Sequence, residues 1–382
     1  MFLDTATIVE HIGFPKGVTQ GLCPRPPLAA GGIHFHYSIA EDNVLDDQNA
    51  TGDSVLDIRN LKTYFYTSRG VAKAVDDISL TLHKGEFLGL VGESGCGKTV
   101  TALSALKLVP FPGKVVEGRV TFMGTDILSQ PEKAMQHIRG RKMAMISQDP
   151  MSSLNPVWTV GDQIETAILR HNKVSRKEAR DRAIEMLKLV AIPAPEKRIR
   201  NYPHELSGGM KQRIMIALAL SCDPEVLIAD NPTTALDTTI QMQFLHLLLE
   251  LREKLNQSVL YITHDLGVVA KICENVAIMY AGKILERGDV FEVLKTPRHP
   301  YTQGLIKSAP NVGARNQNLE AIPGDLPDLL NLPPGCRFAD RCARAMPRCH
   351  EDAPVPEAWF SDKHAALCWL YEKDGAAKGG QL

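Results

Sequence analysis

The sequence predicts an α/β fold whose core is a largely parallel sheet covered by helices on both faces. Three observations predict it: short apolar runs at 86–92, 225–230 and 258–263, helix-length segments between them, and glycines at the end of the first run. Strands that are buried on both faces appear as continuous apolar runs, and their alternation with helices is typical of a parallel sheet. A length of 382 residues suggests two or three domains.

The other elements follow along the chain. Segments 54–66 and 76–85 alternate polar and apolar residues, as antiparallel strands do. A helix is expected at 98–109, and further strands at 118–124 and 142–148. A polar, helix-rich insertion then occupies about residues 151–205.

Three parts of the chain differ in composition. Residues 1–53 show no sustained hydrophobic period, and we expect a mostly disordered N-terminal extension there. Residues 54–290 carry the strand and helix patterns of the main domain. Over 291–382 prolines become dense and cysteines cluster, which predicts a C-terminal extension.

Composition excludes several classes of protein. Hydrophobic residues make up 44% and charged residues 23%, as in ordinary globular proteins, and a net charge of −1 gives no reason to expect nucleic acid as a partner. We find no run of about 18 apolar residues and no signal peptide, so we expect neither a membrane span nor export. Four of the 8 cysteines cluster in the tail, and without export metal ligation explains this cluster better than disulfides do.

Residues 92–99, GESGCGKT, match the phosphate-loop pattern G-x-x-x-x-G-K-[ST] between an expected strand and an expected helix. Gly92, Gly95 and Gly97 let the backbone curl so that its N–H groups converge on phosphate oxygens, and the helix N-terminus adds positive potential. Lys98 would reach the β- and γ-phosphates, and Thr99 would ligate Mg²⁺. The motif therefore predicts binding of a nucleotide with Mg²⁺.

Further strand ends carry polar residues. Asp230 closes the run EVLIAD, at the end of a strand where ligands bind in α/β sheets, and would hold the water shell of Mg²⁺. Gln148 and His264 also follow expected strands. The segment LSGGMKQR at 206–213 begins another helix and offers a second anion site. One fold needs this second site only if it serves a nucleotide held by a neighbouring subunit.

The order and spacing of these stretches resemble the nucleotide-binding subunits of ABC transporters over residues 54 to about 290. The resemblance implies a P-loop NTPase fold of the ABC type, with an antiparallel β subdomain, a helical subdomain and a head-to-tail dimer that holds each ATP between two subunits. It implies catalytic roles for Gln148 and His264, a general-base position at Asn231, and Mg²⁺ held at Thr99, Gln148 and Asp230. The implied nucleotide contacts are Phe65, Gly92, Ser94, Gly95, Cys96, Gly97, Lys98, Thr99, Val100, Gln148, Asp230, Ser207, Gly208, Gly209, Gln212 and Asp237. Phe65 is the expected aromatic partner of adenine, with Tyr64 and Tyr66 as alternatives.

Segments 296–310 and 332–342 are similar to the C-terminal extension of oligopeptide and dipeptide importer ATPases. This resemblance implies an energy-coupling subunit at the cytoplasmic face of the inner membrane. Its partners would be a second, different ATPase subunit, two membrane permease subunits that face Gln148 and the helical insertion, and an external solute-binding protein. Alternatives are an importer of nickel or another small solute, and a soluble ABC ATPase that acts on DNA or ribosomes. The second alternative lacks support from a tandem cassette, a coiled coil or a basic surface.

Four cysteines in the tail, Cys336, Cys342, Cys349 and Cys368, have the spacing C-x₅-C-x₆-C-x₁₈-C. Structural zinc sites usually contain a tighter C-x₂₋₄-C pair, whereas four thiolates can hold a [4Fe–4S] cluster, with which the tail of this family is associated. We expect an iron–sulfur cluster, with zinc or unmetallated thiols as alternatives.

Asn231 departs from the family pattern, in which a glutamate follows the aspartate of the Walker B strand, here Asp230 at the end of 226–230, and polarises the attacking water. An amide cannot accept a proton at neutral pH, and loss of a general base costs about 10²–10⁴ in rate. We therefore expect the chain to bind Mg-ATP but to hydrolyse it slowly. The amide fits an engineered substitution that traps the ATP-bound dimer, a degenerate site in an asymmetric heterodimer, or a site whose base comes from another residue.

Overall fold

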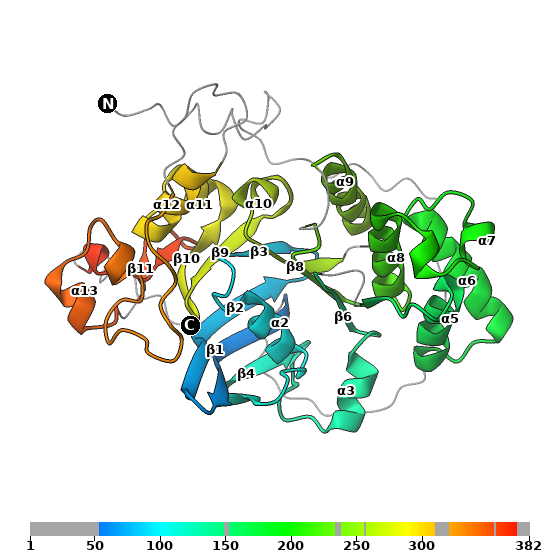
Figure 1. The fold of residues 1–382 in the computed structure, drawn as a ribbon, viewed down its shortest axis with the longest axis horizontal. Coiled ribbons are helices and arrows are strands. Elements are labelled where there is room, and N and C mark those ends of the chain that lie inside the picture. Colours follow the sequence, from blue (N-terminus) through cyan, green and yellow to red (C-terminus); the bar gives the residue numbers. More distant parts are fainter. Residues whose placement is uncertain are drawn as a thin grey trace.

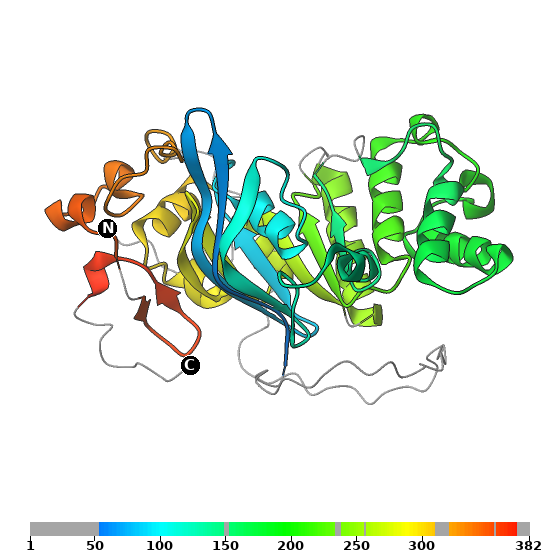
Figure 2. The same ribbon diagram turned by 90° about the horizontal axis from the view of Figure 1, so that it is seen from below.

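The computed structural model describes most of the chain from Asp53 onward. Of the extension expected over 1–53, only Asp53 lies within the described part. The described residues are 53–148, 153–233, 238–255, 257–309, 321–354 and 357–372. Two sheets stand at the centre, with a helical lobe at one end and the C-terminal segments at the other (Figures 1 and 2).

The larger sheet confirms the predicted parallel core. Within the described residues its strands follow the order β11-β12-β10-β9-β3-β8-β7-β6. From β9 to β6 all neighbours run parallel, and these strands are the buried apolar runs of the sequence. At the other edge the pairing is antiparallel. The strands are β3 (Phe87–Val91), β6 (Met143–Ile146), β7 (Val226–Asp230), β8 (Ser258–Thr263), β9 (Asn275–Tyr280), β10 (Lys283–Asp289), β11 (Ala358–Trp359) and β12 (Ala365–Ala366).

A second, antiparallel sheet follows the order β2-β1-β4-β5. Its strands are β1 (Ser54–Thr67), β2 (Gly70–His83), β4 (Gly113–Phe122) and β5 (Thr125–Asp126). The alternating segments of the sequence form β1 and most of β2, as predicted. β4 begins earlier than its apolar pattern indicates, because the left-handed Gly118 (φ 100°) and a register shift against β1 interrupt the alternation.

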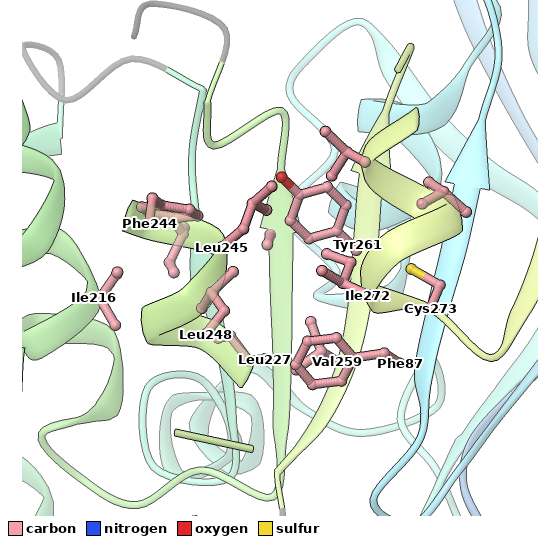
Figure 3. Close-up of a cluster of buried hydrophobic side chains, with 14 of the residues drawn as sticks. Phe87, Ile216, Leu227, Phe244, Leu245, Leu248, Val259, Tyr261, Ile272 and Cys273 are labelled. Carbon is pink, nitrogen blue, oxygen red and sulfur yellow. The ribbon is translucent and has the colours of Figure 1, made fainter. Parts of the chain in front are cut away.

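Helices cover both faces of the parallel sheet. They include α2 (Lys98–Ala105), α3 (Glu132–Ile138), α9 (Thr238–Leu255), α10 (Leu266–Ile272), α11 (Val290–Lys295) and α12 (Pro300–Ser308). Figure 3 shows Phe244, Leu245 and Leu248 of α9 beside Leu227 of β7 and Tyr261 of β8, all buried. Residues three and four positions apart, such as Leu245 and Leu248 or Phe244 and Leu248, share a helix face, so this apolar stripe fixes α9 against the sheet.

The predicted helical insertion forms a lobe beside β6 (Figure 1). The insertion contains α5 (Val160–His171), α6 (Arg176–Leu189), α7 (Pro195–Arg198) and the short 3₁₀ helix η1 (Pro203–Glu205). The lobe continues past the predicted end at about 205 with α8 (Gly208–Leu220). Capping boxes at Thr159 with Asp162 and at Ser175 with Glu178 start α5 and α6. Each box satisfies two backbone N–H groups that the first turn of the helix leaves without partners.

The C-terminal segments lie against the core. They contain η2 (Ala339–Arg341), α13 (Pro347–Glu351) and η3 (Trp369–Tyr371), and β12 pairs with β10. The carboxylate of Glu286, buried on β10, accepts hydrogen bonds from the backbone N–H groups of Arg298 (2.7 Å) and His299 (2.8 Å) and contacts His364 Nε2 at 2.7 Å. In the described part of the chain, no helix is long and apolar enough to cross a membrane.

Candidate nucleotide-binding site

Four neighbouring parallel strands end at the same level, which brings the predicted site residues to one edge of the sheet. The paired residues near these ends are Ile146 with Ala229, Asp230 with Ile262, and Val91 with Thr263. The site residues that follow the ends are Gly92, Gln148, Asn231 and His264. This carboxyl edge is where α/β sheets bind ligands.

The loop at 92–99 joins β3 to α2, as predicted. A Cβ added at Gly92 would lie 2.0 Å from the carbonyl oxygen of Met279, and one added at Gly97 would lie 2.3 Å from the carbonyl oxygen of Ala74. Only glycine therefore fits at these two positions. Gly97 also has a φ of 112°, which glycine adopts without steric cost. Helix α2 begins without a side-chain cap, so its first N–H groups remain available to a ligand. The loop therefore fits a phosphate group.

Lys98 is only 4% exposed. Its Nζ donates hydrogen bonds to the carbonyl oxygens of Gly92 (2.7 Å) and Glu93 (2.8 Å) and lies 3.6 Å from Cys96 Sγ. These contacts hold the ammonium group at the loop. Burial raises the pKa of the Cys96 thiol, so Cys96 serves as a small, uncharged residue in the loop.

Asp230 ends β7 and is 2% exposed. Burial raises the pKa of its carboxyl above the usual range, while a hydrogen bond with Thr99 and the charge of Lys98 lower it in part. The hydroxyl of Thr99 and the carboxylate of Asp230 are thus neighbours. Oxygen ligands of this kind fit Mg²⁺. In the same loop Thr99, Ser94 and Gly95 are exposed, and Val100 is half-buried.

Asn231 occupies the predicted general-base position and is half-buried. Its backbone N–H donates to the carbonyl oxygen of Ile262 at 2.8 Å, and its Nδ2 lies 3.4 Å from Asp230 Oδ1. Its φ of 45° is left-handed, a conformation that asparagine adopts more readily than most residues. Gln148 and His264 are exposed at their strand ends. The site thus presents an amide beside the carboxylate of Asp230.

The predicted second anion site at 206–213, which we call the signature, lies at the start of α8. Ser207 caps this helix by accepting a hydrogen bond from the N–H of Met210 at 3.4 Å. Ser207 and Gly208 are exposed, and Gly209 is half-buried. Because α8 packs against α5, α6 and β6, it lies apart from α2 in both views (Figures 1 and 2). The chain does not bring its own signature onto its own phosphate loop.

Two other predicted contacts have different surroundings. Gln212 is buried on α8, and its side-chain amide donates to the carbonyl oxygen of Pro232, two residues after β7. Asp237 lies outside the described residues.

The three candidates for stacking on adenine, Tyr64, Phe65 and Tyr66, have different surroundings. Phe65 is half-buried and lies so close to Gly113 that an added Cβ there would come within 2.7 Å of its ring. The hydroxyl of Tyr64 donates to Asp76 Oδ1 at 2.6 Å, whereas Tyr66 is exposed. The stacking of adenine on Phe65 stays a prediction.

The four tail cysteines line one small cavity together with His299 and Phe338; we call it the cysteine cavity. Its volume of about 20 Å³ has room for about one water molecule. Burial raises the pKa of Cys336 and Cys368 to about 11, and that of Cys342 above its usual range.

The prediction of an iron–sulfur cluster is therefore wrong. The described residues contain no group of three or more His, Cys, Asp or Glu side chains placed to hold a metal ion. The zinc alternative has no support for the same reason. The prediction used only the spacing of the four cysteines along the sequence. That spacing does not show where their thiols point in the folded chain.

The sequence did not predict that the C-terminal extension contacts the phosphate loop. Arg341 Nη1 lies 2.9 Å from Glu93 Oε2, and the N–H of Glu93 donates to the hydroxyl of Tyr301 at 3.0 Å. The only sequence signal is the conspicuous segment CRFADRC, which contains Arg337 and Arg341.

Comparisons with known proteins agree with this geometry. Residues 75–234 match the family described as ABC transporter, and residues 285–349 match the family described as oligopeptide/dipeptide transporter, C-terminal region. A probable peptide ABC transporter ATP-binding protein of Sinorhizobium fredii is 50% identical over 323 residues, which cover 84% of this chain and 96% of the relative. A dipeptide transport ATP-binding protein of Bacillus subtilis is 48% identical, with 84% and 96% covered.

Solved structures show the same fold. A dimeric ATP-binding cassette in a post-hydrolysis state, bound to ADP and Pi, has a TM-score of 0.56 and 26% identity and covers 62% of this chain and 98% of its own. The cbiO1 component of an ABC transporter complex from Clostridium perfringens has a TM-score of 0.55 and 26% identity, with 64% and 92% covered. The chain belongs to the ATP-binding subunits of ABC transporters, a family of ATPases, and carries the C-terminal region of the oligopeptide/dipeptide transporter group.

Proposed function

We propose that the chain is the energy-coupling subunit of an importer for dipeptides or oligopeptides and works at the cytoplasmic face of the inner membrane. The alignment of four strand ends around the loop at 92–99 carries the nucleotide part of this proposal. The peptide part is supported by relatives that are themselves named as peptide transport proteins, two of which are 50% and 48% identical.

The geometry supports a defined role for each residue around the nucleotide. Backbone N–H groups at the start of α2 and the ammonium of Lys98 bind and orient the phosphates. Thr99, Asp230 and Gln148 would hold Mg²⁺, which supplies positive charge to the phosphate oxygens. His264 lies at the neighbouring strand end, where it can contact the terminal phosphate. Phe65 is the proposed adenine partner.

A second ATPase subunit would complete the site. The exposed N-terminus of α8, with Ser207 and Gly208, is separate from the chain's own phosphate loop and is free to face the nucleotide of a partner. Because Asn231 removes the proton acceptor from this chain's site, we propose that the partner is a different chain whose own site hydrolyses ATP. The signature of the present chain would complete that site.

A groove between the sheet and the helical lobe supports docking of a permease subunit. Its volume is about 390 Å³, and it is lined by Ser147 and Ser153, which flank the Gln148 segment, and by Ala167, His171 and Leu218. A structural element inserted there would touch both the strand end of Gln148 and the helical lobe. Such an element could therefore sense closure of the nucleotide site.

Steady-state ATP hydrolysis by the chain purified without its partner ATPase tests the role of Asn231, because a partner whose own site hydrolyses ATP would mask it. Asn231→Glu should raise the rate by about 10²–10⁴, because a carboxylate can accept the proton of the attacking water. Asn331→Glu makes the same change at an exposed position of the extension and should leave the rate unchanged.

Two results would count against the proposal. If Asn231→Glu hydrolyses ATP no faster than the parent chain while binding Mg-ATP normally, position 231 does not limit hydrolysis. If the chain fails to assemble with the permease subunits, the importer role is wrong.

A further inference from the structure

Glu93, the second residue of the phosphate loop, is held from the C-terminal extension through both its side chain and its backbone. Its carboxylate lies 2.9 Å from the guanidinium of Arg341, and its N–H donates to the hydroxyl of Tyr301 at 3.0 Å. More than 200 residues of sequence separate Glu93 from each partner. The extension therefore contacts the loop that the proposed function assigns to the phosphates.

The same residue also holds the lysine of the loop. The carbonyl oxygen of Glu93 accepts a hydrogen bond from Lys98 Nζ at 2.8 Å and one from the N–H of Cys96 at 3.3 Å. Arg341 thus fixes one side of Glu93, while the other side orients the ammonium group that would bind phosphate. Movement of Glu93 would move an acceptor of Lys98.

Arg341 is suited to hold this position. Its side chain is only 8% exposed, and its Nε donates to the carbonyl oxygen of Pro323 at 2.8 Å. Its Nη1 also lies 3.2 Å from the hydroxyl of Tyr280 on β9. The rigid fork of a guanidinium can serve these acceptors together, whereas the single ammonium of a lysine cannot. Arg341 therefore contacts the extension, the sheet and the phosphate loop at the same time.

A second arginine of the extension reinforces the contact. Arg337 donates to Asp76 on β2 and to the carbonyl oxygen of Ala281. The next residue, Gly282, donates its N–H to the carbonyl oxygen of Cys96 in the loop at 2.8 Å. Arg337 thus links the extension to the phosphate loop indirectly, through Ala281 and Gly282 of the core.

We propose that Arg341 is a positioning residue for nucleotide binding, which fixes Glu93 and through it the ammonium group of Lys98. The C-terminal extension is then part of the nucleotide site rather than an independent appendage. This inference rests on the proposed binding of nucleotide phosphates at 92–99. Without Arg341, the carboxylate of Glu93 loses its ion-pair partner at a site that is only 27% exposed, and the loop loses a fixed point.

Titration of the full-length chain with Mg-ATP and Mg-ADP tests the proposal. Arg341→Met should weaken the affinity for both nucleotides about tenfold. Arg341→Lys, which keeps the charge, should recover part of the loss. If the two residues act through each other, Glu93→Gln should weaken binding about threefold, and adding it to Arg341→Met should cause no further loss.

Arg287→Met is the matched control. Arg287 pairs with Glu357 of the extension at 2.6 Å, a contact between core and extension that does not involve the phosphate loop. The variant Arg287→Met should leave the affinity for Mg-ATP and Mg-ADP unchanged. Circular dichroism and thermal unfolding show whether each variant is folded, and Glu93→Gln becomes the deciding variant if Arg341→Met does not fold.

Lys98→Ala separates this inference from the proposed function. If Lys98→Ala binds Mg-ATP like the parent chain, the assignment of the phosphate loop fails. If Lys98→Ala loses binding while folded Arg341→Met or Glu93→Gln binds as tightly as the parent chain, only the role of Arg341 is overturned. An equal loss of affinity in Arg287→Met would also overturn it, because the effect would then reflect docking of the extension in general.

Discussion

The phosphate loop and the cysteine cavity both gather polar groups, but they do so in different ways. The loop is one continuous segment between β3 and α2, in which Lys98 Nζ is bound to two loop carbonyl oxygens and the first N–H groups of α2 have no side-chain cap. The cysteine cavity collects thiols from separate turns around about 20 Å³. The loop has donors fixed toward a ligand, whereas the cavity is close to filled by its own side chains.

The difference concerns what fixes the polar groups. In the loop, backbone conformation sets the geometry, and neighbouring backbone at Ala74 and Met279 excludes any side chain from Gly97 and Gly92. In the cavity, thiols lie on turns whose positions depend on packing, and burial raises the pKa of Cys336 and Cys368 to about 11. Uncharged thiols of this kind pack as small apolar groups.

Gly97→Ala is the most severe test of whether backbone conformation sets the geometry of the phosphate loop. The new Cβ would lie 2.3 Å from the carbonyl oxygen of Ala74, and the φ of 112° disfavours alanine. We expect Mg-ATP affinity to fall at least about 100-fold, and the free energy of unfolding to fall by about 2–4 kcal/mol. Nucleotide titration and urea unfolding measure the two effects.

Gly124→Ala provides the matched comparison. Gly124 also has a left-handed φ, of 80°, but no atom of the described residues lies within 4 Å of an added Cβ. Alanine there should cost about 1–2 kcal/mol of backbone strain and leave Mg-ATP affinity unchanged. Equal losses of affinity in the two variants would show that steric contact with Ala74 does not shape the loop.

His299 tests how closely the cysteine cavity is packed. Burial lowers the pKa of this histidine to about 4, against an opposing effect of Glu286. Because the folded chain binds this proton less readily than the unfolded chain, its contribution to stability is complete above pH 6.5 and falls as the pH is lowered toward 4. The free energy of unfolding should decrease by about 3 kcal/mol over this range through His299 alone.

The variant His299→Asn separates this titration from that of nearby carboxylates. His299 caps α12 by accepting a hydrogen bond from the N–H of Tyr301 at 3.0 Å, and asparagine is a good cap that does not titrate. Urea unfolding at a series of pH values should therefore give a shallower decline in the variant. Parallel curves for the two proteins would mean that His299 is not held in its neutral form.

The same contrast explains which features the sequence could predict. The phosphate loop and the strand ends depend on residues a few positions apart, and each was predicted from local pattern. The capping boxes at Thr159 and Ser175 are equally local, but they were not predicted. The pairing of β12 with β10 and the contact of Arg341 with Glu93 join distant parts of the chain. No local pattern encodes such contacts, and no spacing encodes where a thiol points.

Cysteine substitutions are expected to change stability without changing nucleotide affinity, which separates the cysteine cavity from the phosphate loop. If each thiol packs as a small apolar group, the loss of stability should follow burial. Cys349→Ser places a hydroxyl at a buried position and should cost about 1–3 kcal/mol, whereas Cys342→Ser, at a half-buried position, should cost less than about 1 kcal/mol.

A bound group shared by the four cysteines would produce a different pattern in the same unfolding experiment. Its loss would destabilise both variants by a similar amount, because each would remove one ligand of one common site. Mg-ATP affinity serves as the internal control and should be unchanged in both, since neither cysteine contacts Glu93 or Arg341 in the described hydrogen bonds. Similar destabilisation of Cys342→Ser and Cys349→Ser, or stoichiometric iron or zinc in the purified parent chain, would contradict the packing interpretation of the cysteine cavity.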